Sequence, residues 1–294
     1  MALVAAFAIA VASTPAGISG AVLLLPFQVG VLGTPSPAVT PTNLLYNVVA
    51  APGGLYRYWR QGQTGGRLAR VLIAGTLPGV TAGSVIRVEL LPDPQVFDLV
   101  VAVVLLPLGL WLAFTSGPGP TGHPRLRLPA ALLVPLAAAV GCVGGIYGIG
   151  GGSILAPMLI TSGREPAEVA PAALASTFVT SVAGVITFTV LSAHSRGTVA
   201  PDWPTGVALG IGGLAGAYTG ARLQARIPDA SIRRLVGIAV IAIGARYLWT
   251  GLLSAVRLLP PSCWPAPARS AAIARKLAQR AKDLVIVRPA SRAW

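Results

Sequence analysis

The sequence predicts an all-α polytopic membrane protein made of two homologous four-segment repeats. Three observations support this prediction: the composition, the number of apolar segments, and a repeated order of glycine and proline along the chain. Hydrophobic residues make up 54% of the 294 residues and charged residues 10%, whereas charged residues make up about 25% of a typical globular domain. A membrane-spanning helix needs about 20 mostly apolar residues, and this chain has enough for several.

About eight apolar segments follow one another along the chain. They span about residues 1–31, 40–58, 68–88, 96–115, 128–161, 168–193, 204–221 and 232–255. A linker rich in proline and glycine divides them into two sets of four. We therefore expect a membrane repeat over 1–115, the linker over 116–127, a second membrane repeat over 128–258 and a basic C-terminal tail over 259–294. Residues 1–56 carry no charged side chain, which favours a first membrane segment over a signal peptide with its basic start.

The fifth segment contains an unusual glycine run. Gly144–Gly152 holds six glycines in nine positions, inside a stretch of 36 uncharged residues, Leu128–Gly163. Each glycine destabilises a helix by about 1 kcal/mol relative to alanine, so we expect the helix to break here. Broken backbone at membrane depth is tolerated only where it is buried in protein or lines a wet cavity. The break therefore predicts a transport site.

The first segment carries a milder copy of this motif. Gly17–Ala21, followed by Pro26, stands where Gly148–Gly152, followed by Pro157, stands in the fifth segment. Other residue types recur in the same order at spacings of 130 to 137: Val39 and Val169, Pro41 and Pro171, Gly54 and Gly184, Gly75 and Gly212, and Asp93 and Asp229. Matching glycine and proline interruptions in two halves are typical of the binding site of secondary transporters.

The arginines indicate how the two interrupted segments run. If all eight segments cross the membrane, the loop arginines divide six to seven between the two sides; if the first and fifth segments are re-entrant, they divide eleven to two. The positive-inside rule favours the second arrangement. Each half then has an odd number of crossings, so we expect the two repeats to be inverted relative to each other.

The third and seventh segments each carry glycines four residues apart. Gly75, Gly79 and Gly83 lie on one face of a helix, and so do Gly212, Gly216 and Gly220. Such faces allow helix backbones to approach closely, so we expect these glycines to serve helix packing rather than to bind substrate. Arg246, inside the eighth segment, either reaches the interface with its long side chain or binds an anion.

The binding site is expected where the two glycine breaks meet uncharged polar side chains. Backbone N–H groups at helix N-termini favour anions, and Asn47 and Thr177 occupy equivalent positions in the two repeats. The candidate substrate-binding residues are Gly17, Ser19, Gly20, Asn43, Asn47, Tyr147, Gly148, Gly150, Gly151, Gly152, Ser153 and Thr177. The alternative for the serine and threonine hydroxyls is hydrogen bonding to neighbouring helices.

Several other classes of function find little support. The chain has two histidines and two cysteines, and no cluster of acids, histidines or nucleophiles lies within an apolar segment. We therefore expect no enzyme activity, no metal and no cofactor. The net charge of +14 reflects arginines that flank apolar segments and eight basic residues at or after Arg257, so nucleic acid is not the expected partner.

Two motifs resemble a known family. Gly145–Pro157 resembles the signature of the TauE/SafE (sulfite exporter) permeases, and Pro37–Asn47 resembles the matching part of that family's first half. The resemblance covers about residues 10–256. It implies a multi-pass carrier in the plasma membrane that moves a small anion, such as sulfite or an organosulfonate. Another organic or inorganic anion, and a non-transporting membrane organiser that acts through the basic tail, remain alternatives. The sequence leaves a homo-oligomer open.

Overall fold

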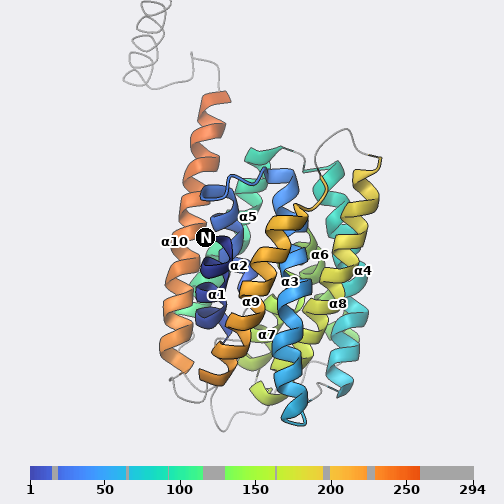
Figure 1. Cartoon of the computed structure of the whole chain (residues 1–294). Helices are drawn as coiled ribbons and strands as arrows, with labels where there is room; N and C mark the ends of the chain where they lie inside the picture. The colour runs from blue at the N-terminus through green and yellow to red at the C-terminus, as the bar shows by residue number, and fades with distance from the viewer. Residues whose placement is uncertain are drawn as a thin grey trace, which may run out of the picture.

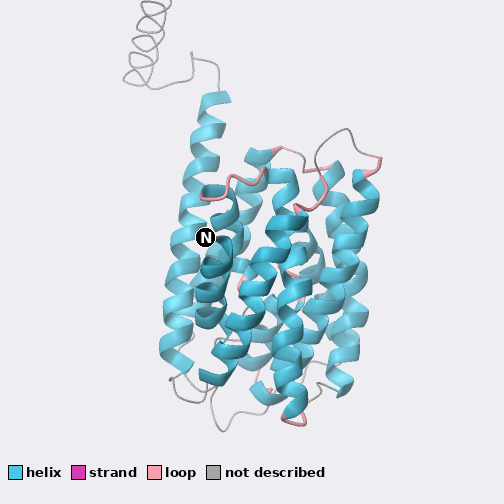
Figure 2. Ribbon diagram, in the orientation of Figure 1, coloured by secondary structure: helices cyan, strands magenta, loops and turns pink. Residues whose placement is uncertain are grey.

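In the described part of the chain, the computed structural model is a bundle of ten helices (Figures 1 and 2). It describes residues 1–14, 19–63, 66–91, 93–114, 130–162, 164–194, 199–223 and 229–258. The helices are α1 (Ala2–Ser13), α2 (Ala21–Gly30), α3 (Ser36–Arg60), α4 (Gly66–Glu89), α5 (Pro94–Phe114), α6 (Ala130–Tyr147), α7 (Gly152–Thr161), α8 (Pro166–Ser192), α9 (Trp203–Leu223) and α10 (Asp229–Leu258). Every predicted apolar segment is helical, and the first and fifth are each divided into two helices, as the glycines predict. The linker at 116–127, the tail at 259–294 and Gly17 lie outside the described residues.

Four long helices pack side by side in the order α9, α3, α8 and α4. Helix α3 runs parallel to α9, since Gly206 lies against Leu45 and Gly210 lies against Val49. Helices α4 and α8 are also parallel to each other, and both are antiparallel to α3. The Thr76 and Ser176 hydroxyls, 2.8 Å apart, join α4 to α8. The last residues of α3 and the first residues of α4 and α8 lie at one end of the bundle. We call it the arginine-rich end.

The arginine-rich end carries most of the arginines of the described helices and loops. They are Arg57, Arg60, Arg67, Arg70, Arg164 and Arg222. At the other end, which we call the opposite end, lie residues 31–35, 90–91 and 199–202. Arg87 lies there, 2% exposed, over the ring of Phe97. Its guanidinium donates to the Ser36 carbonyl and hydroxyl, both at 2.9 Å, and to the Leu91 carbonyl, so it ties α3 to the C-terminal end of α4.

Helices α6 and α7 form a hairpin that enters and leaves at the arginine-rich end. Helix α6 runs parallel to α4: Gly75 lies against Val134 and Ala137, and further along Gly145 lies against Val80. Helix α7 then returns. One apolar cluster joins the beginnings of α4, α6 and α8 to α7 through Leu68, Leu133, Val169 and Leu159.

Helices α1 and α2 form a second hairpin, which enters and leaves at the opposite end. Helix α1 runs parallel to α9, because Gly212 lies against Leu3 and Gly220 against Val11. Helix α2 then returns towards the beginning of α3. In both hairpins the first arm packs on the glycine face of a long helix, α9 for α1 and α4 for α6. The predicted packing role of these glycines is confirmed.

Helices α5 and α10 pack antiparallel at the edge of the bundle, beside α1 and α2 (Figure 1). Gly109 approaches the Ile241 backbone, and Gly237 approaches Ala113. Arg246 on α10 is exposed, and its guanidinium lies over Gly30 at the end of α2. It therefore reaches the surface at the opposite end, which fits the first of its two predicted roles.

The bundle has an apolar surface, and several polar side chains are buried within its largely apolar interior. Large apolar side chains are exposed on several helices, among them Val4, Leu99, Val103, Phe114, Ile186, Ile211, Ile238, Trp249 and Leu252. Nearly fully buried polar side chains include Gln28, Asn43, Asn47, Thr76, Ser84, Ser176, Thr177, Thr180 and Ser181. Among the described residues, α4 and most of α8, Glu168–Ser192, are long and apolar enough to span a membrane. Polar groups inside and apolar groups outside suit lipid as the surrounding solvent.

Candidate substrate cavity

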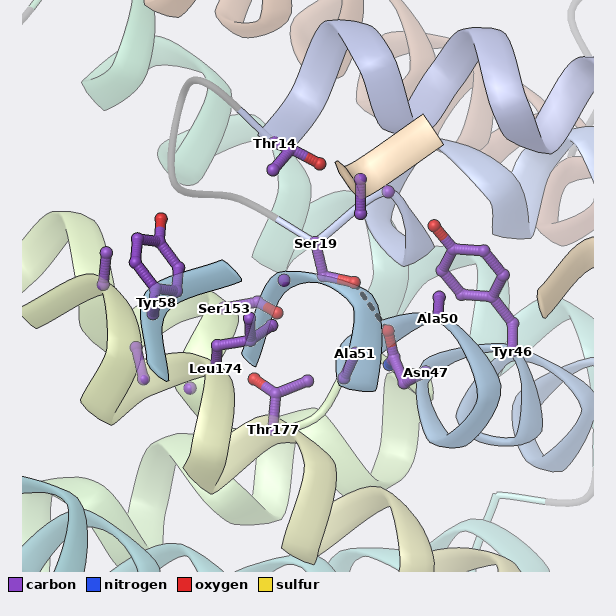
Figure 3. A pocket seen from close by; sticks show the side chains of 16 residues that line it. Thr14, Ser19, Tyr46, Asn47, Ala50, Ala51, Tyr58, Ser153, Leu174 and Thr177 are labelled. Atoms are coloured by element: carbon purple, nitrogen blue, oxygen red, sulfur yellow. Dashed lines mark hydrogen bonds between the residues drawn. The ribbon is translucent and has the colours of Figure 1, made fainter. Parts of the chain in front are cut away.

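A cavity lies between the two hairpins and the middle of α3 and α8 (Figure 3). Its volume is about 60 Å³, whereas a site for a single water needs about 10–15 Å³, so it has room for a small polyatomic ion. The lining residues are Thr14, Ser19, Gly20, Tyr46, Asn47, Ala50, Ala51, Gly54, Tyr58, Gly152, Ser153, Ala170, Ala173, Leu174, Thr177 and Ala217.

Two helices begin at this cavity. Ser19 and Gly20 directly precede α2, Gly152 and Ser153 are the first residues of α7, and all four line the cavity. The first N–H groups of a helix have no partner within the helix, and the helix dipole places partial positive charge there. The cavity thus receives the positive ends of two ten-residue helices that run away from it in opposite directions.

The amide of Asn47, which lines the cavity, has one unpaired hydrogen-bond donor. The Ala21 N–H donates to the Ser19 hydroxyl at 3.2 Å, and that hydroxyl donates to Asn47 Oδ1 at 2.6 Å (Figure 3). This chain of bonds makes Oδ1 the acceptor, so the NH2 group faces elsewhere. Asn47 is 2% exposed, and its Nδ2 has no hydrogen-bond partner. A buried amide without a partner is costly, which indicates a group that a bound acceptor would satisfy.

Three hydroxyl-bearing side chains line the cavity together with Asn47. Figure 3 shows Ser19, Ser153 and Thr177 around the same space. Thr177 is 2% exposed, and the Ser153 hydroxyl donates to the Ile149 carbonyl at 3.1 Å. None of the described residues that line the cavity is charged, so they offer dipoles and hydroxyls.

The cavity extends towards the arginine-rich end. Its α3 wall runs from Asn47 to Tyr58, about 16 Å at 1.5 Å per residue. The rest of that wall and of the facing helices is small or apolar: Ala50, Ala51, Gly54, Ala170, Ala173, Leu174 and Ala217. Apart from Thr14 and Tyr58, the polar lining groups therefore lie at the deep end, in the middle of the bundle.

The turn between α6 and α7 depends on glycine. Gly148 and Gly150 have φ of +81° and +71°, a region that residues with a Cβ rarely adopt. A Cβ on Gly148 would also lie 2.5 Å from the Thr40 carbonyl oxygen, and one on Gly150 would lie 2.9 Å from the Thr177 methyl. The turn is therefore packed tightly against α3 and α8, and this holds the beginning of α7 at the cavity.

The structure divides the candidate residues into two groups. Ser19, Gly20, Asn47, Gly152, Ser153 and Thr177 line the cavity. Gly148, Gly150 and Gly151 form the buried turn behind it, and Asn43 and Tyr147 lie beyond its deep end in hydrogen bonds to α2.

Sequence reasoning missed two side chains near the cavity. Gln28 is fully buried, and its Nε2 donates to Asn43 Oδ1 at 3.0 Å; as the one amide among residues 1–31, it stood out from its apolar surroundings. Tyr58, near the end of α3, also lines the cavity. In the sequence it lies between Arg57 and Arg60, a setting that is typical of a residue at the membrane interface. The described residues hold no group of three His, Cys, Asp or Glu side chains that could bind a metal.

Comparison with protein families decides the class of this protein. The family model "Sulfite exporter TauE/SafE" matches residues 2–247. The chain belongs to the TauE/SafE family. It is therefore a membrane transporter, and the predicted resemblance is confirmed.

Relatives of this TauE/SafE protein are themselves described as membrane transporters. It is 26% identical over 252 residues to a "Probable membrane transporter protein" of Xylella fastidiosa (strain 9a5c), a match that covers 82% of this chain and 91% of the relative. YjnA of Bacillus subtilis (strain 168) is 22% identical over 244 residues, 79% of this chain and 92% of that protein. YunE of the same strain is 29% identical over 126 residues, which cover 42% and 44% of the two chains. No solved structure matches the chain.

Proposed function

We propose that this TauE/SafE protein is a secondary carrier that binds a small anion in the cavity. The observation that carries the proposal is the unpartnered Nδ2 of Asn47, held in place as a donor by the Ser19 hydroxyl. An anion accepts hydrogen bonds, and the beginnings of α2 and α7 add the favourable ends of two helix dipoles. A cation would find the same groups unfavourable, because N–H groups and helix N-termini repel positive charge.

Sulfite or an organosulfonate is the substrate that we test first, because the family's name refers to sulfite export. Both carry oxygens that accept several hydrogen bonds at once, which matches donors converging from α2, α3 and α7. Another small organic or inorganic anion is the alternative, since dipoles and hydroxyls recognise negative charge and size more than they recognise the central atom.

Transport is proposed to use two inverted repeats, α1–α5 and α6–α10. The packing of the described helices supports this, because it is nearly unchanged when the two sets are exchanged: α1 packs on α9 as α6 packs on α4, and α3 packs on α9 as α8 packs on α4. The α1–α2 and α6–α7 hairpins enter from opposite ends, which supports two re-entrant segments and six crossing helices. Binding sites of such transporters lie where the repeats meet.

The orientation follows from the arginines. The arginine-rich end is proposed to face the cytoplasm of a cell whose plasma membrane holds the protein, since cytoplasmic loops carry an excess of arginine and lysine. The cavity then opens towards the cytoplasm, where an exported anion would enter.

Uptake of radiolabelled sulfite by proteoliposomes tests the proposal. Asn47→Asp keeps the shape of the side chain but replaces the donor with a negative charge. A hydrogen bond to a charged group contributes about 1.5–3 kcal/mol, so sulfite uptake should fall by about tenfold or more. Asn47→Leu should also lose uptake, whereas Ser84→Ala, a buried change that lies outside the cavity lining, should keep it.

Two results would contradict the proposal. One is unchanged uptake by both Asn47 variants. The other is a wild-type protein that moves none of a panel of sulfite, methanesulfonate, sulfate, phosphate and acetate.

A further inference from the structure

A layer of buried, hydrogen-bonded side chains lies beyond the deep end of the cavity. We define this layer, the seal, as Gln28 on α2, Thr40 and Asn43 on α3, and Tyr147 at the end of α6. All four are 0–1% exposed. None lines the cavity, so they lie between it and the opposite end of the bundle.

The hydrogen bonds of the seal join both hairpins to α3. Gln28 Nε2 donates to Asn43 Oδ1 at 3.0 Å, and Asn43 Nδ2 donates to the Ala21 carbonyl at 2.9 Å. The Tyr147 hydroxyl donates to the Val22 carbonyl at 3.0 Å, and the Thr40 hydroxyl donates to the Ile146 carbonyl at 3.2 Å. Tyr147 and Val22 come from different hairpins, so this bond connects the two proposed repeats directly.

Towards the other end of the bundle, the described counterparts of three seal residues are apolar. With the spacings of 130 and 131 that relate the halves, Leu159 corresponds to Gln28, Ala170 to Thr40 and Ala173 to Asn43. The helices are in contact in both repeats. A Cβ on Gly152 of α7 would meet the Ala173 carbonyl of α8, and the Asn43 side chain of α3 meets the Ala21 carbonyl of α2. Alanine and leucine, however, have no side-chain group that could form the hydrogen bonds.

We infer that this seal is a one-sided gate, which closes the cavity to the opposite end and favours the conformation that opens towards the arginine-rich end. Closing the arginine-rich end instead would break at least the bonds between the two hairpins and gain no polar seal in return. The resting protein therefore presents its site on one side. This inference rests on the proposed function, which requires that the site reach both sides in turn.

The test replaces seal residues with their counterparts from the other repeat. Gln28→Leu and Asn43→Ala, made together, should make the two ends alike. A single reporter cysteine, Ala51→Cys on the cavity wall, is placed in a Cys142→Ala, Cys263→Ser background of the full-length chain. An impermeant thiol reagent is applied to membrane vesicles of each orientation, with Gln61→Cys and His194→Cys as markers of the two sides.

When the seal is intact, the reporter should react with reagent on the arginine-rich side and not with reagent on the opposite side. In the double variant, labelling from the opposite side should rise about tenfold, because two net hydrogen bonds of about 0.5–1.5 kcal/mol each are lost. Ser176→Ala is the matched control: it removes a buried bond between α4 and α8 outside the seal and should leave the labelling ratio unchanged.

An unchanged ratio in the double variant, or equal labelling of the intact reporter from both sides, would overturn the inference. If the double variant does not yield a folded protein, Tyr147→Phe, which removes one hydroxyl, replaces it, and an unchanged ratio in that variant overturns the inference equally. Labelling needs no transported anion, so a failure of the seal and a failure of the proposed anion transport give separate results.

Discussion

The tight turn at Gly148 leads to a prediction with a built-in control. Gly148 and Gly62 both have positive φ, +81° and +73°. A Cβ on Gly148 would lie 2.5 Å from the Thr40 carbonyl oxygen, whereas a Cβ on Gly62 would meet nothing within 4 Å. Alanine at either position carries the same backbone strain, about 1–2 kcal/mol. Only Gly148→Ala adds overpacking, about 1–3 kcal/mol, because a buried backbone carbonyl cannot move aside as a side chain can.

The difference between the two variants therefore isolates the contact with Thr40. At about 2–4 °C per kcal/mol for chains of this size, Gly148→Ala should melt about 2–12 °C below Gly62→Ala. Samples of the purified protein in detergent are heated to a series of temperatures, and size-exclusion chromatography then measures the fraction that remains folded, which gives the two melting temperatures. Equal melting temperatures would refute the reasoning, since they would mean that the turn can move away from α3 without loss. We also expect Gly148→Ala to lower anion uptake, because the same movement displaces the beginning of α7.

Two further predictions concern stability and topology. Arg87→Gln removes the guanidinium bonds to α3 and to the end of α4 and should destabilise the protein by about 3 kcal/mol. The control, Arg246→Gln at an exposed position, should change stability by less than about 0.5 kcal/mol. Similar melting temperatures for the two variants would contradict the role given to Arg87. Single cysteines at Gln61 and Glu165 should be labelled from the same side of the membrane and one at His194 from the other side. Labelling of Gln61→Cys together with His194→Cys, with Glu165→Cys labelled from the other side, would mean that α6 and α7 together cross the membrane.

Local chemistry made much of this fold readable. The apolar runs predicted the helices within a few residues, because backbone groups in lipid must be paired internally. The six glycines of Gly144–Gly152 predicted the break before α7, since glycine both weakens a helix and permits the positive φ found at Gly148 and Gly150. The four-residue spacing of Gly75, Gly79 and Gly83 predicted a packing face, although it could not name α6 as the partner.

The site was predictable only in part. Asn47 and Thr177 were recognised from their equivalent positions in the two halves, and both line the cavity. Asn43, one helical turn before Asn47, shares its face and its chemistry, yet it lies in the seal because α2 approaches α3 there. Sequence spacing fixes the face of a helix on which a side chain lies, whereas the neighbouring helix decides whether that face borders a cavity or a packed layer.

The sequence by itself determined the class of this protein, its helical segments, its two glycine breaks and its family, because these depend on composition and on patterns within one helix. Only the tertiary structure decided where the breaks meet, which side chains line the cavity and that Asn47 Nδ2 is left unpaired. Those features arise between helices far apart in the chain: the Ser19–Asn47 bond spans 28 residues, and the Tyr147–Val22 bond spans 125. The glycines specify that the chain turns, and the packing of α3 and α8 around both turns makes a cavity there.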